Sequence, residues 1–182
     1  WQMDLSVILE ACNRTMLKLQ HGDFKYADGI LERWYRTGVH TLQDVHKADE
    51  NFAREKAAKR QELVGVCLDC FVEKGLTVAT TKNLCKAAKL QNGGIYYYFS
   101  AKEEIVLACA EEAISRIEKA AFAIVLEDIS DIKSMMDHLG ELADKMSPTM
   151  RFLVSVCVSR EYGEKVKPSL VRLAERKGRN NR

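Results

Sequence analysis

The sequence predicts an all-α protein, and three observations lead to that class. Only two prolines, Pro148 and Pro168, interrupt 182 residues, and apolar residues recur at helical rather than alternating spacing. An apolar content of 47% and a charged content of 30% are ordinary for a globular protein. No apolar run approaches the roughly 20 residues that a membrane helix needs. We therefore expect no membrane segment, and a protein of the cytoplasm.

Two helices are expected before residue 38. Asp4 or Ser6 can cap the first helix, which runs to about Lys18. The second covers about residues 24–37 and ends at Gly38, which suits the C′ position. The buried face of the first helix is expected to consist of apolar residues at helical spacing: Leu5, Ile8, Leu9, Cys12, Met16 and Leu19.

A third helix is expected from Thr41 to about Lys56, because the segment TLQD places an acidic residue three after the cap, as in a capping box. The stretch NFAREKAAKRQELV follows without Gly, Pro or Ser, and is typical of continuous helix rather than of a linker. It either joins two modules rigidly or brings together segments that are not neighbours in a natural protein. The sequence begins at Trp1 without an initiator methionine, so we expect a fragment or a processed chain.

Within the second helix, Tyr26, Ile30 and Trp34 recur on one face, and their periodicity alone favours a core stripe. The segment KYADGILERWYRTGVHTLQDVHKAD also resembles the C-terminal domain of DnaD-like replication proteins, with its Y-x-x-x-I-x-x-x-W signature, over about residues 3–56. That resemblance implies that Tyr26, Ile30 and Trp34 bind single-stranded DNA or a replication-initiation protein. Eight Lys and Arg against nine Asp and Glu give this module no electrostatic preference for nucleic acid.

The clearest motif is TTKNLCKAAKLQNGGIYYYFSAK, residues 80–102. Thr80 and Thr81 can cap a short helix, LQN interrupts it, and Gly93 and Gly94 permit close backbone approach. Three tyrosines follow. The stretch holds no carboxylate and four lysines: Lys82, Lys86, Lys89 and Lys102. Two short helices across a tight turn, basic and aromatic on the exposed side, predict a DNA-binding helix-turn-helix.

The same stretch resembles the DNA-binding motif of the TetR family of transcriptional regulators, whose pattern reads roughly TT-x-x-I-A-x-x-A-G-V-S-x-G-x-L-Y-x-H-F-x-S-K-E-x-L. The matching residues are Thr80, Thr81, Leu84, Ala88, Leu90, Gly93, Ile95, Tyr96, Phe99, Lys102 and Glu103. Three positions depart from the pattern: Lys89, Gln91 and Tyr98 replace the turn glycine, the capping serine and a histidine. The turn must then form without a residue at positive φ or tolerate strain, and we expect altered DNA preference with the helix-turn-helix kept.

We expect a recognition helix, about residues 92–99, to enter the major groove. Gln91 and Asn92 are expected to meet base edges, and Gly94 to let the backbone approach the duplex. Phosphate or sugar contacts are expected from the remaining site residues: Thr81, Tyr96, Tyr97, Tyr98 and Lys102. The core between the two helices is expected to contain Leu84, Ala88, Leu90, Ile95 and Phe99.

The expected domains are residues 1–57, a DnaD-like module; 58–106, the helix-turn-helix domain; and 107–182, a short helical domain for effector and dimer contacts. An opening helix of about residues 59–74 buries Leu63, Val66, Cys67, Cys70 and Phe71. After the motif we expect a helix over residues 102–126, then one from Asp128 or Ser130 to about Met146. Ser147 and Pro148 are expected to open another helix, and Pro168 a last segment.

The TetR resemblance implies a sequence-specific regulator, a repressor, that binds double-stranded DNA as a homodimer and responds to a small apolar effector. Candidate effector residues, for which simple core filling is the favoured interpretation, are Met135, Met136, Leu139, Met146, Met150 and Phe152. The alternative is a replication-associated protein that contacts DNA and replication-initiation partners.

We expect no enzyme and no cofactor, because the sequence holds no nucleophile–base pair, paired carboxylates or phosphate loop. Cys67 and Cys70 form a C-x-x-C pair with no partner pair that would complete a zinc site. The sequence therefore predicts buried thiols at these positions rather than a metal site.

Overall fold

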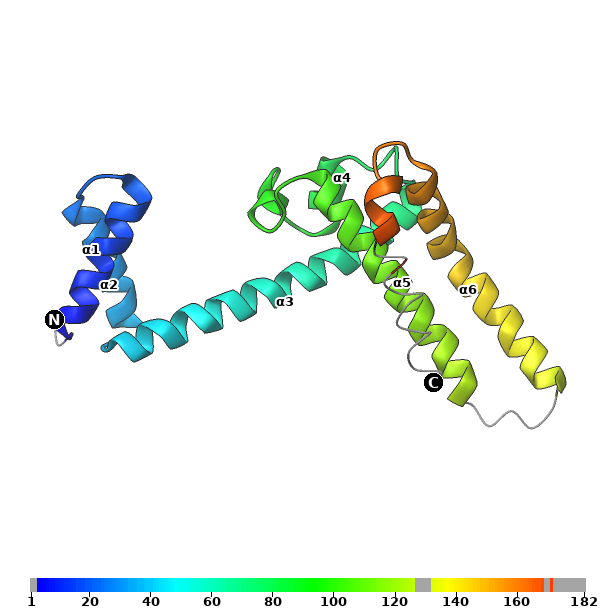
Figure 1. The fold of residues 1–182 in the computed structure, drawn as a ribbon, viewed down its shortest axis with the longest axis horizontal. Coiled ribbons are helices and arrows are strands. Elements are labelled where there is room, and N and C mark those ends of the chain that lie inside the picture. Colours follow the sequence, from blue (N-terminus) through cyan, green and yellow to red (C-terminus); the bar gives the residue numbers. More distant parts are fainter. Residues whose placement is uncertain (1–2, 127–131, 169–170, 172–182) are drawn as a thin grey trace. The chain divides into compact units, whose positions relative to one another are not determined.

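The computed structural model describes residues 3–126, 132–168 and 171, with backbone alone at 121–126, 132–136 and 138. Every regular element in this part of the chain is helical, which confirms the all-α class (Figure 1). The chain divides into two compact units, Trp1–Ala58 and Lys59–Arg182, here called the first and second units. No helix of the described part is long and apolar enough to cross a membrane.

The first unit contains α1 (Leu5–Leu19), α2 (Phe24–Arg36) and the beginning of α3 (Leu42–Lys74). The Asp23 carboxylate caps α2 by accepting a bond from the Tyr26 N–H at 2.9 Å. The expected capping box at the start of α3 is confirmed: Asp44 accepts from the Thr41 N–H at 2.9 Å, and the Thr41 hydroxyl accepts from the Asp44 N–H at 3.2 Å. The core that these helices enclose contains Val7, Ala11, Trp34, Val39 and Val45.

The expected buried face of α1 is wrong in part. Leu5, Leu9 and Met16 are 71%, 55% and 50% exposed, whereas Ile8, Cys12 and Leu19 are half-buried. The fully buried residues are Val7, Ala11 and Thr15. Thr15 tolerates burial because its hydroxyl donates to the Ala11 carbonyl at 2.8 Å.

One continuous helix, α3, runs through the stretch NFAREKAAKRQELV, as the absence of helix breakers indicated. Its C-terminal part belongs to the second unit and buries Leu63, Cys67 and Phe71, as expected, together with Val64 and Leu68; Val66 is only half-buried. The Cys67 and Cys70 thiols lie in this core, and burial raises the pKa of Cys67 to about 12. Both thiols therefore stay protonated at neutral pH, in keeping with packing side chains.

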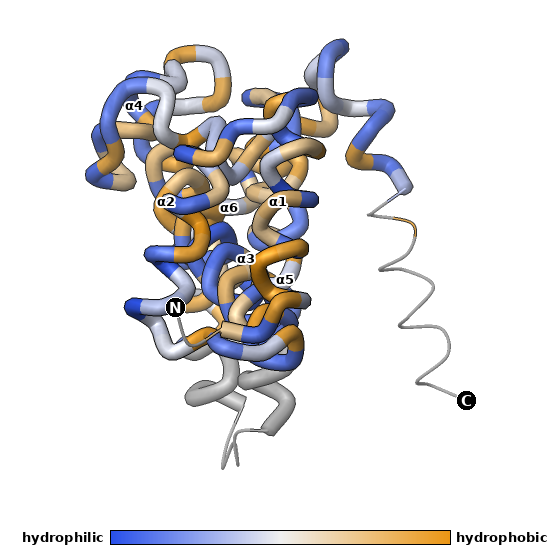
Figure 2. Tube along the Cα trace, turned by 90° about the vertical axis from the view of Figure 1, so that its left-hand side faces the viewer, coloured by the Kyte–Doolittle hydropathy of each residue, from blue (hydrophilic) through white to orange (hydrophobic). Residues whose placement is uncertain are grey.

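The rest of the second unit contains α4 (Thr81–Ala87), a 3₁₀ helix η1 (Gly94–Tyr97), α5 (Lys102–Leu126) and α6 (Ile132–Val158). The bounds of α5 are those the sequence predicts, and α5 and α6 lie side by side (Figure 1). Figure 2 shows hydrophobic and hydrophilic residues alternating along the helices, as expected where one face of each helix is buried.

The expected helix boundary at Pro148 is wrong, because α6 continues through this residue. Proline has no N–H to donate a hydrogen bond to the Asp144 carbonyl. Because Asp144 is exposed, water can donate to that carbonyl instead. Beyond the proline, Phe152 and Val156 pack into the core and stabilise the continuing helix. Residues 163–168 form a further helical segment, so Pro168 lies at the end of this segment and does not begin one. The expected cap residues Asp128 and Ser130, and the chain after residue 171, lie outside the described residues.

Candidate nucleic-acid interface

A reciprocal capping box fixes the start of α4. The Thr80 hydroxyl accepts a bond from the Asn83 N–H at 3.3 Å, and the Asn83 side-chain oxygen accepts from the Thr80 N–H at 2.9 Å. Two of the N–H groups that a helix start leaves without partners are thereby satisfied. The box leaves Thr81 as the first residue of α4, half-buried at the helix N-terminus.

The turn after α4 forms at Lys89, which adopts the left-handed conformation with φ 55°. The next N–H, from Leu90, donates to the Cys85 carbonyl at 2.8 Å and closes the helix end. A side chain with a Cβ pays about 1–2 kcal/mol for this conformation. The sequence left two alternatives: a turn without a residue at positive φ, or a turn that tolerates strain. The positive φ of Lys89 shows that the strained turn forms.

The expected core of the motif is confirmed. Leu84 and Ile95 are fully buried, Phe99 is 2% exposed, and Ala88 and Leu90 pack against them. These contacts link α4 to the segment after the turn, so the two parts of the motif are held by apolar burial.

The helix expected over residues 92–99 is shorter in the structure. It is the single 3₁₀ turn η1, preceded by Gly93 at φ 81° without a side-chain cap. Two successive glycines and no capping serine explain the difference, since both disfavour an α-helix start. Gln91 and Asn92 therefore lie exposed in the preceding turn, and Gly94 is half-buried, where a Cβ would lie 3.4 Å from the Cβ of Leu90.

The three tyrosines divide between surface and core. Tyr96 and Tyr97 are 48% and 54% exposed, whereas Tyr98 is half-buried and packs against the core. The Tyr96 hydroxyl lies 3.2 Å from the Thr81 hydroxyl, so the start of α4 and η1 bring two hydrogen-bonding groups together. The Tyr97 and Tyr98 rings meet edge to face, with centroids 4.9 Å apart.

Positive charge dominates this surface. Lys82, Lys86 and Lys89 are exposed and form no ion pair with any residue that the structure describes. The carboxylates that flank the motif in the sequence are engaged elsewhere: Glu73 pairs with Lys74, Glu103 with Lys165, and Glu104 with Arg60. Lys102 is half-buried at the first position of α5. An exposed set of unpaired ammonium groups beside hydroxyl donors is suited to a phosphate backbone.

Arg60 is a residue of this site that the sequence did not indicate. Its guanidinium lies 4.6 Å from the centroid of the Phe99 ring and donates to Glu104 at 2.7 Å. Glu104 also accepts from the Ser100 N–H at 2.7 Å, and this bond, followed by the Arg60 contact, lowers the pKa of Glu104. Arg60 and Glu104 lie 44 residues apart in the sequence, so no local pattern signals their contact.

A second candidate site lies in the first unit, where a pocket of about 500 Å³ brings together the three residues of the Y-x-x-x-I-x-x-x-W signature. Tyr26 and Ile30 are half-buried, and Trp34 is buried at 3% exposure, as expected of a core stripe. The guanidinium of Arg14 lies 5.1 Å from the Trp34 ring. Trp34 therefore forms part of the floor and offers no free face for stacking.

Basic side chains surround this pocket: Arg14, Lys18, Lys25 and Arg33. Arg14 is neutralised by Asp49 and Glu10, and its hydrogen bond lowers the pKa of Asp49. Lys18, Lys25 and Arg33 have no ion-pair partner within the described chain. The fold thus concentrates positive charge locally, although the charges of the module balance in the sequence.

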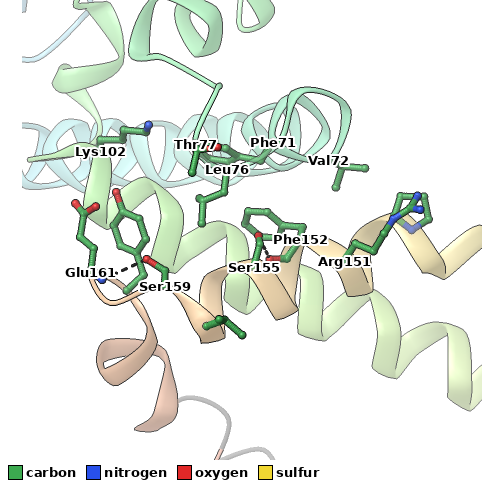
Figure 3. Close-up of a pocket in the computed structure, with 14 residues that line it drawn as sticks. Phe71, Val72, Leu76, Thr77, Lys102, Arg151, Phe152, Ser155, Ser159 and Glu161 are labelled. Atoms are coloured by element: carbon green, nitrogen blue, oxygen red, sulfur yellow. Dashed lines mark hydrogen bonds between the residues drawn. The ribbon is translucent and has the colours of Figure 1, made fainter.

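A third cavity, of about 710 Å³, lies between α6 and the segment that follows α3 (Figure 3). Of the expected effector residues, Phe152 lines it, and Met150 lies on an exposed face of α6. Leu139 is 41% exposed and Met146 half-buried, neither lining this cavity. The side chains of Met135 and Met136 lie outside the described residues.

Comparison with known families gives two matches. Residues 66–109 match the family model of bacterial regulatory proteins of the tetR family. Residues 1–49 match a family model described as replication initiation and membrane attachment. Both resemblances of the sequence are thereby confirmed, each over about a quarter of the chain.

Similar proteins include HTH-type transcriptional repressors. AcnR of Corynebacterium diphtheriae is 30% identical over 84 residues, 46% of this chain and 43% of that protein. KstR2 of Rhodococcus jostii is 33% identical over 51 residues, 28% of this chain and 25% of that protein. The uncharacterized HTH-type regulator YfiR of Bacillus subtilis is 28% identical over 123 residues, 62% of this chain and 60% of that protein.

The chain spans 43%, 25% and 60% of the lengths of these three relatives. No solved structure matches the chain.

Proposed function

We propose that the chain is a sequence-specific, double-stranded DNA-binding regulator of TetR type, a repressor, with residues 80–102 as its DNA-reading element. The observation that carries the proposal is the surface of α4 and η1, where the Thr81 and Tyr96 hydroxyls lie 3.2 Å apart. Lys82 and Lys86 of the same short helix α4 are exposed and form no ion pair with the described residues. The match of residues 66–109 to the tetR family model supports the proposal. We assign the chain a binding role rather than a catalytic one, and place it in the cytoplasm, where bacterial DNA lies.

The site residues divide into two groups by chemistry. Thr81, Tyr96, Tyr97 and Lys102 offer hydroxyl or ammonium groups suited to phosphate oxygens, which position a protein on the duplex. Gln91 and Asn92 offer exposed amides that can pair with base edges. Tyr98 is half-buried and contributes mainly by packing against Tyr97.

We propose a homodimer, since helix-turn-helix proteins read two half-sites about one helical turn apart when they dimerise. The support is an exposed apolar stripe on α6 at four-residue spacing, formed by Met150, Val154 and Val158 at 47%, 58% and 77% exposure. The proposed division into residues 1–57, 58–106 and 107–182 places this stripe in the dimer and effector domain. Sedimentation at tens of micromolar tests the dimer, and a monomeric mass would contradict it.

Selection of bound duplexes from a genomic library tests the proposed function. A palindromic operator supports a dimeric regulator. Recovery of single strands or forked duplexes in preference to any operator supports the second candidate below.

The second candidate is a replication-associated protein that contacts DNA and replication-initiation partners through the first unit. The pocket of Tyr26, Ile30 and Trp34 favours it, because Lys18, Lys25 and Arg33 place unpaired positive charge around that pocket. Lys25→Ala is expected to weaken binding of a single-stranded oligonucleotide. Lys47→Ala, an exposed lysine on α3 away from the pocket, serves as the matched control. If the two substitutions weakened oligonucleotide binding equally, the pocket would not be the binding site for single-stranded DNA.

A further inference from the structure

The cavity of about 710 Å³ in the second unit is lined by both apolar and polar side chains. Phe71 of α3 and Phe152 of α6 both line it, and their rings stack with centroids 5.6 Å apart. Leu76 and Thr77 line it from the segment that leads from α3 to the cap of α4 (Figure 3). Its volume falls within the range of about 300–1,000 Å³ that is common for small-molecule sites.

Charged side chains stand at both ends of this cavity. Figure 3 shows Lys102 and Glu161 at one end, so a cation and a carboxylate share it. Arg151 stands at the other end, exposed, and forms no ion pair with the residues that the structure describes. A guanidinium without a carboxylate partner is an arrangement that favours a bound carboxylate, which arginine can hold through two parallel hydrogen bonds.

We propose that this cavity binds a small amphipathic monoanion, whose carboxylate pairs with Arg151 and whose apolar body covers Phe152 and Leu76. This rests on the proposed function, for which the ligand would be the effector. The ligand class differs from the apolar effector expected from the sequence, because a purely apolar molecule would make no use of the Arg151 guanidinium. A cationic ligand would be repelled by Arg151 at one end, and at the other end Lys102 stands beside Glu161.

The site also contacts the DNA-reading element. Leu76 and Thr77 belong to the connection into α4, whose cap is Thr80. Lys102, which lines the opposite end from Arg151, is the last residue of that element and the first of α5. A ligand in this cavity therefore contacts α6 and both flanks of residues 80–102.

Isothermal titration with sodium octanoate tests the proposal on the full chain. Octanoate is expected to bind at least tenfold more tightly than 1-octanol or octylamine. Arg151→Met is expected to lower octanoate affinity at least tenfold, whereas Arg160→Met, an exposed arginine outside the cavity, should leave it unchanged.

A second pair of variants fixes the location, because Arg151 also borders a shallower groove on α6. Thr77→Glu places a carboxylate inside the cavity and is expected to lower octanoate affinity at least tenfold. Val78→Glu, at an exposed neighbour that does not line the cavity, should have no effect. Both positions are exposed, so neither substitution disturbs the core.

The proposal is overturned if octanoate does not bind, if 1-octanol binds equally well, or if Arg151→Met or Thr77→Glu matches its control. Titration of duplex DNA into the same preparations without octanoate tests the proposed DNA-binding function separately from the ligand site. Duplex binding without octanoate binding overturns the ligand site alone. Octanoate binding without duplex binding overturns the proposed DNA-binding function and leaves the ligand site standing.

Discussion

The guanidinium of Arg60 lies 4.6 Å from the centroid of the Phe99 ring, which follows the 3₁₀ helix η1 by two residues. The same guanidinium pairs with Glu104, which accepts a hydrogen bond from the Ser100 N–H. One side chain of α3 thus contacts both the last core residue of the segment 80–102 and the start of α5. We regard Arg60 as a positioning residue for η1.

Arg60→Met is expected to lower the free energy of unfolding by about 1 kcal/mol, since a cation–π contact contributes about 0.5–2 kcal/mol and the partly exposed ion pair adds little. Lys59→Met, which removes only a surface pair with Glu62, is the control and should have almost no effect. Helical circular dichroism during urea unfolding measures both. A double-mutant cycle with Phe99→Leu should show coupling between positions 60 and 99, and strict additivity would contradict the contact.

Lys89→Gly is expected to stabilise the second unit by up to about 1 kcal/mol. The left-handed conformation costs a residue with a Cβ about 1–2 kcal/mol, whereas the greater entropy of an unfolded glycine costs about 0.5–1 kcal/mol. Lys86→Gly, at an exposed position inside α4, should instead destabilise by about 1 kcal/mol. Urea unfolding of the two variants separates them, and equal losses would contradict the strained turn.

Trp34→Ala is expected to cost the first unit about 3–5 kcal/mol, because the side chain is 3% exposed and its removal leaves a cavity. Phe24→Ala removes a ring that is 91% exposed and should change stability by less than about 0.5 kcal/mol. In a version that lacks Trp1, the fluorescence of Trp34 should be that of a buried indole. A maximum typical of full water exposure would exclude the proposed packing.

Acid should weaken the Glu104 contacts. The Ser100 N–H bond and then Arg60 lower the pKa of Glu104 below its ordinary value of 4.5. A lowered folded-state pKa adds stability above the unfolded pKa, and this stability is lost as pH falls through the folded value. The stability difference between wild type and Glu104→Gln should therefore be constant near neutral pH and shrink below about pH 4.5. A difference that grows on acidification would reverse this assignment.

Local signals predicted the elements that local interactions determine. The Thr80 cap of α4, the Thr41–Asp44 box and the bounds of α5 all follow from caps and periodicity. Pro148 was misjudged because burial of Phe152 and Val156 further along α6 outweighs its local helix-breaking effect. The buried face of α1 was misjudged in part because the face that a helix buries depends on the helices packed against it, which local periodicity does not reveal.

The long-range parts of the candidate site could not be predicted. Arg60 meets Phe99 only once α3 and the motif have packed, and no sequence spacing connects them. Likewise, a balanced charge count for residues 3–56 gave no sign that Lys18, Lys25 and Arg33 gather at one pocket. Both features depend on tertiary contacts between helices.

The salt dependence of duplex binding by paired variants tests most directly the claim that residues 80–102 read DNA. A labelled operator and a random duplex are titrated at several salt concentrations. Lys102→Ala should weaken binding to both and reduce the salt slope by about one unit, because one phosphate contact is lost. Asn92→Ala should leave the slope nearly unchanged and cost about 1–3 kcal/mol on the operator alone.

Tyr97→Phe gives the intermediate case, with about 0.5–1.5 kcal/mol lost from one hydroxyl contact and the ring packing kept. The central claim predicts three different patterns of salt slope and specificity for the three variants. Identical slopes and specificity ratios for Lys102→Ala and Asn92→Ala would contradict the assigned roles. Unchanged binding in both would show that residues 80–102 are not the DNA-reading element.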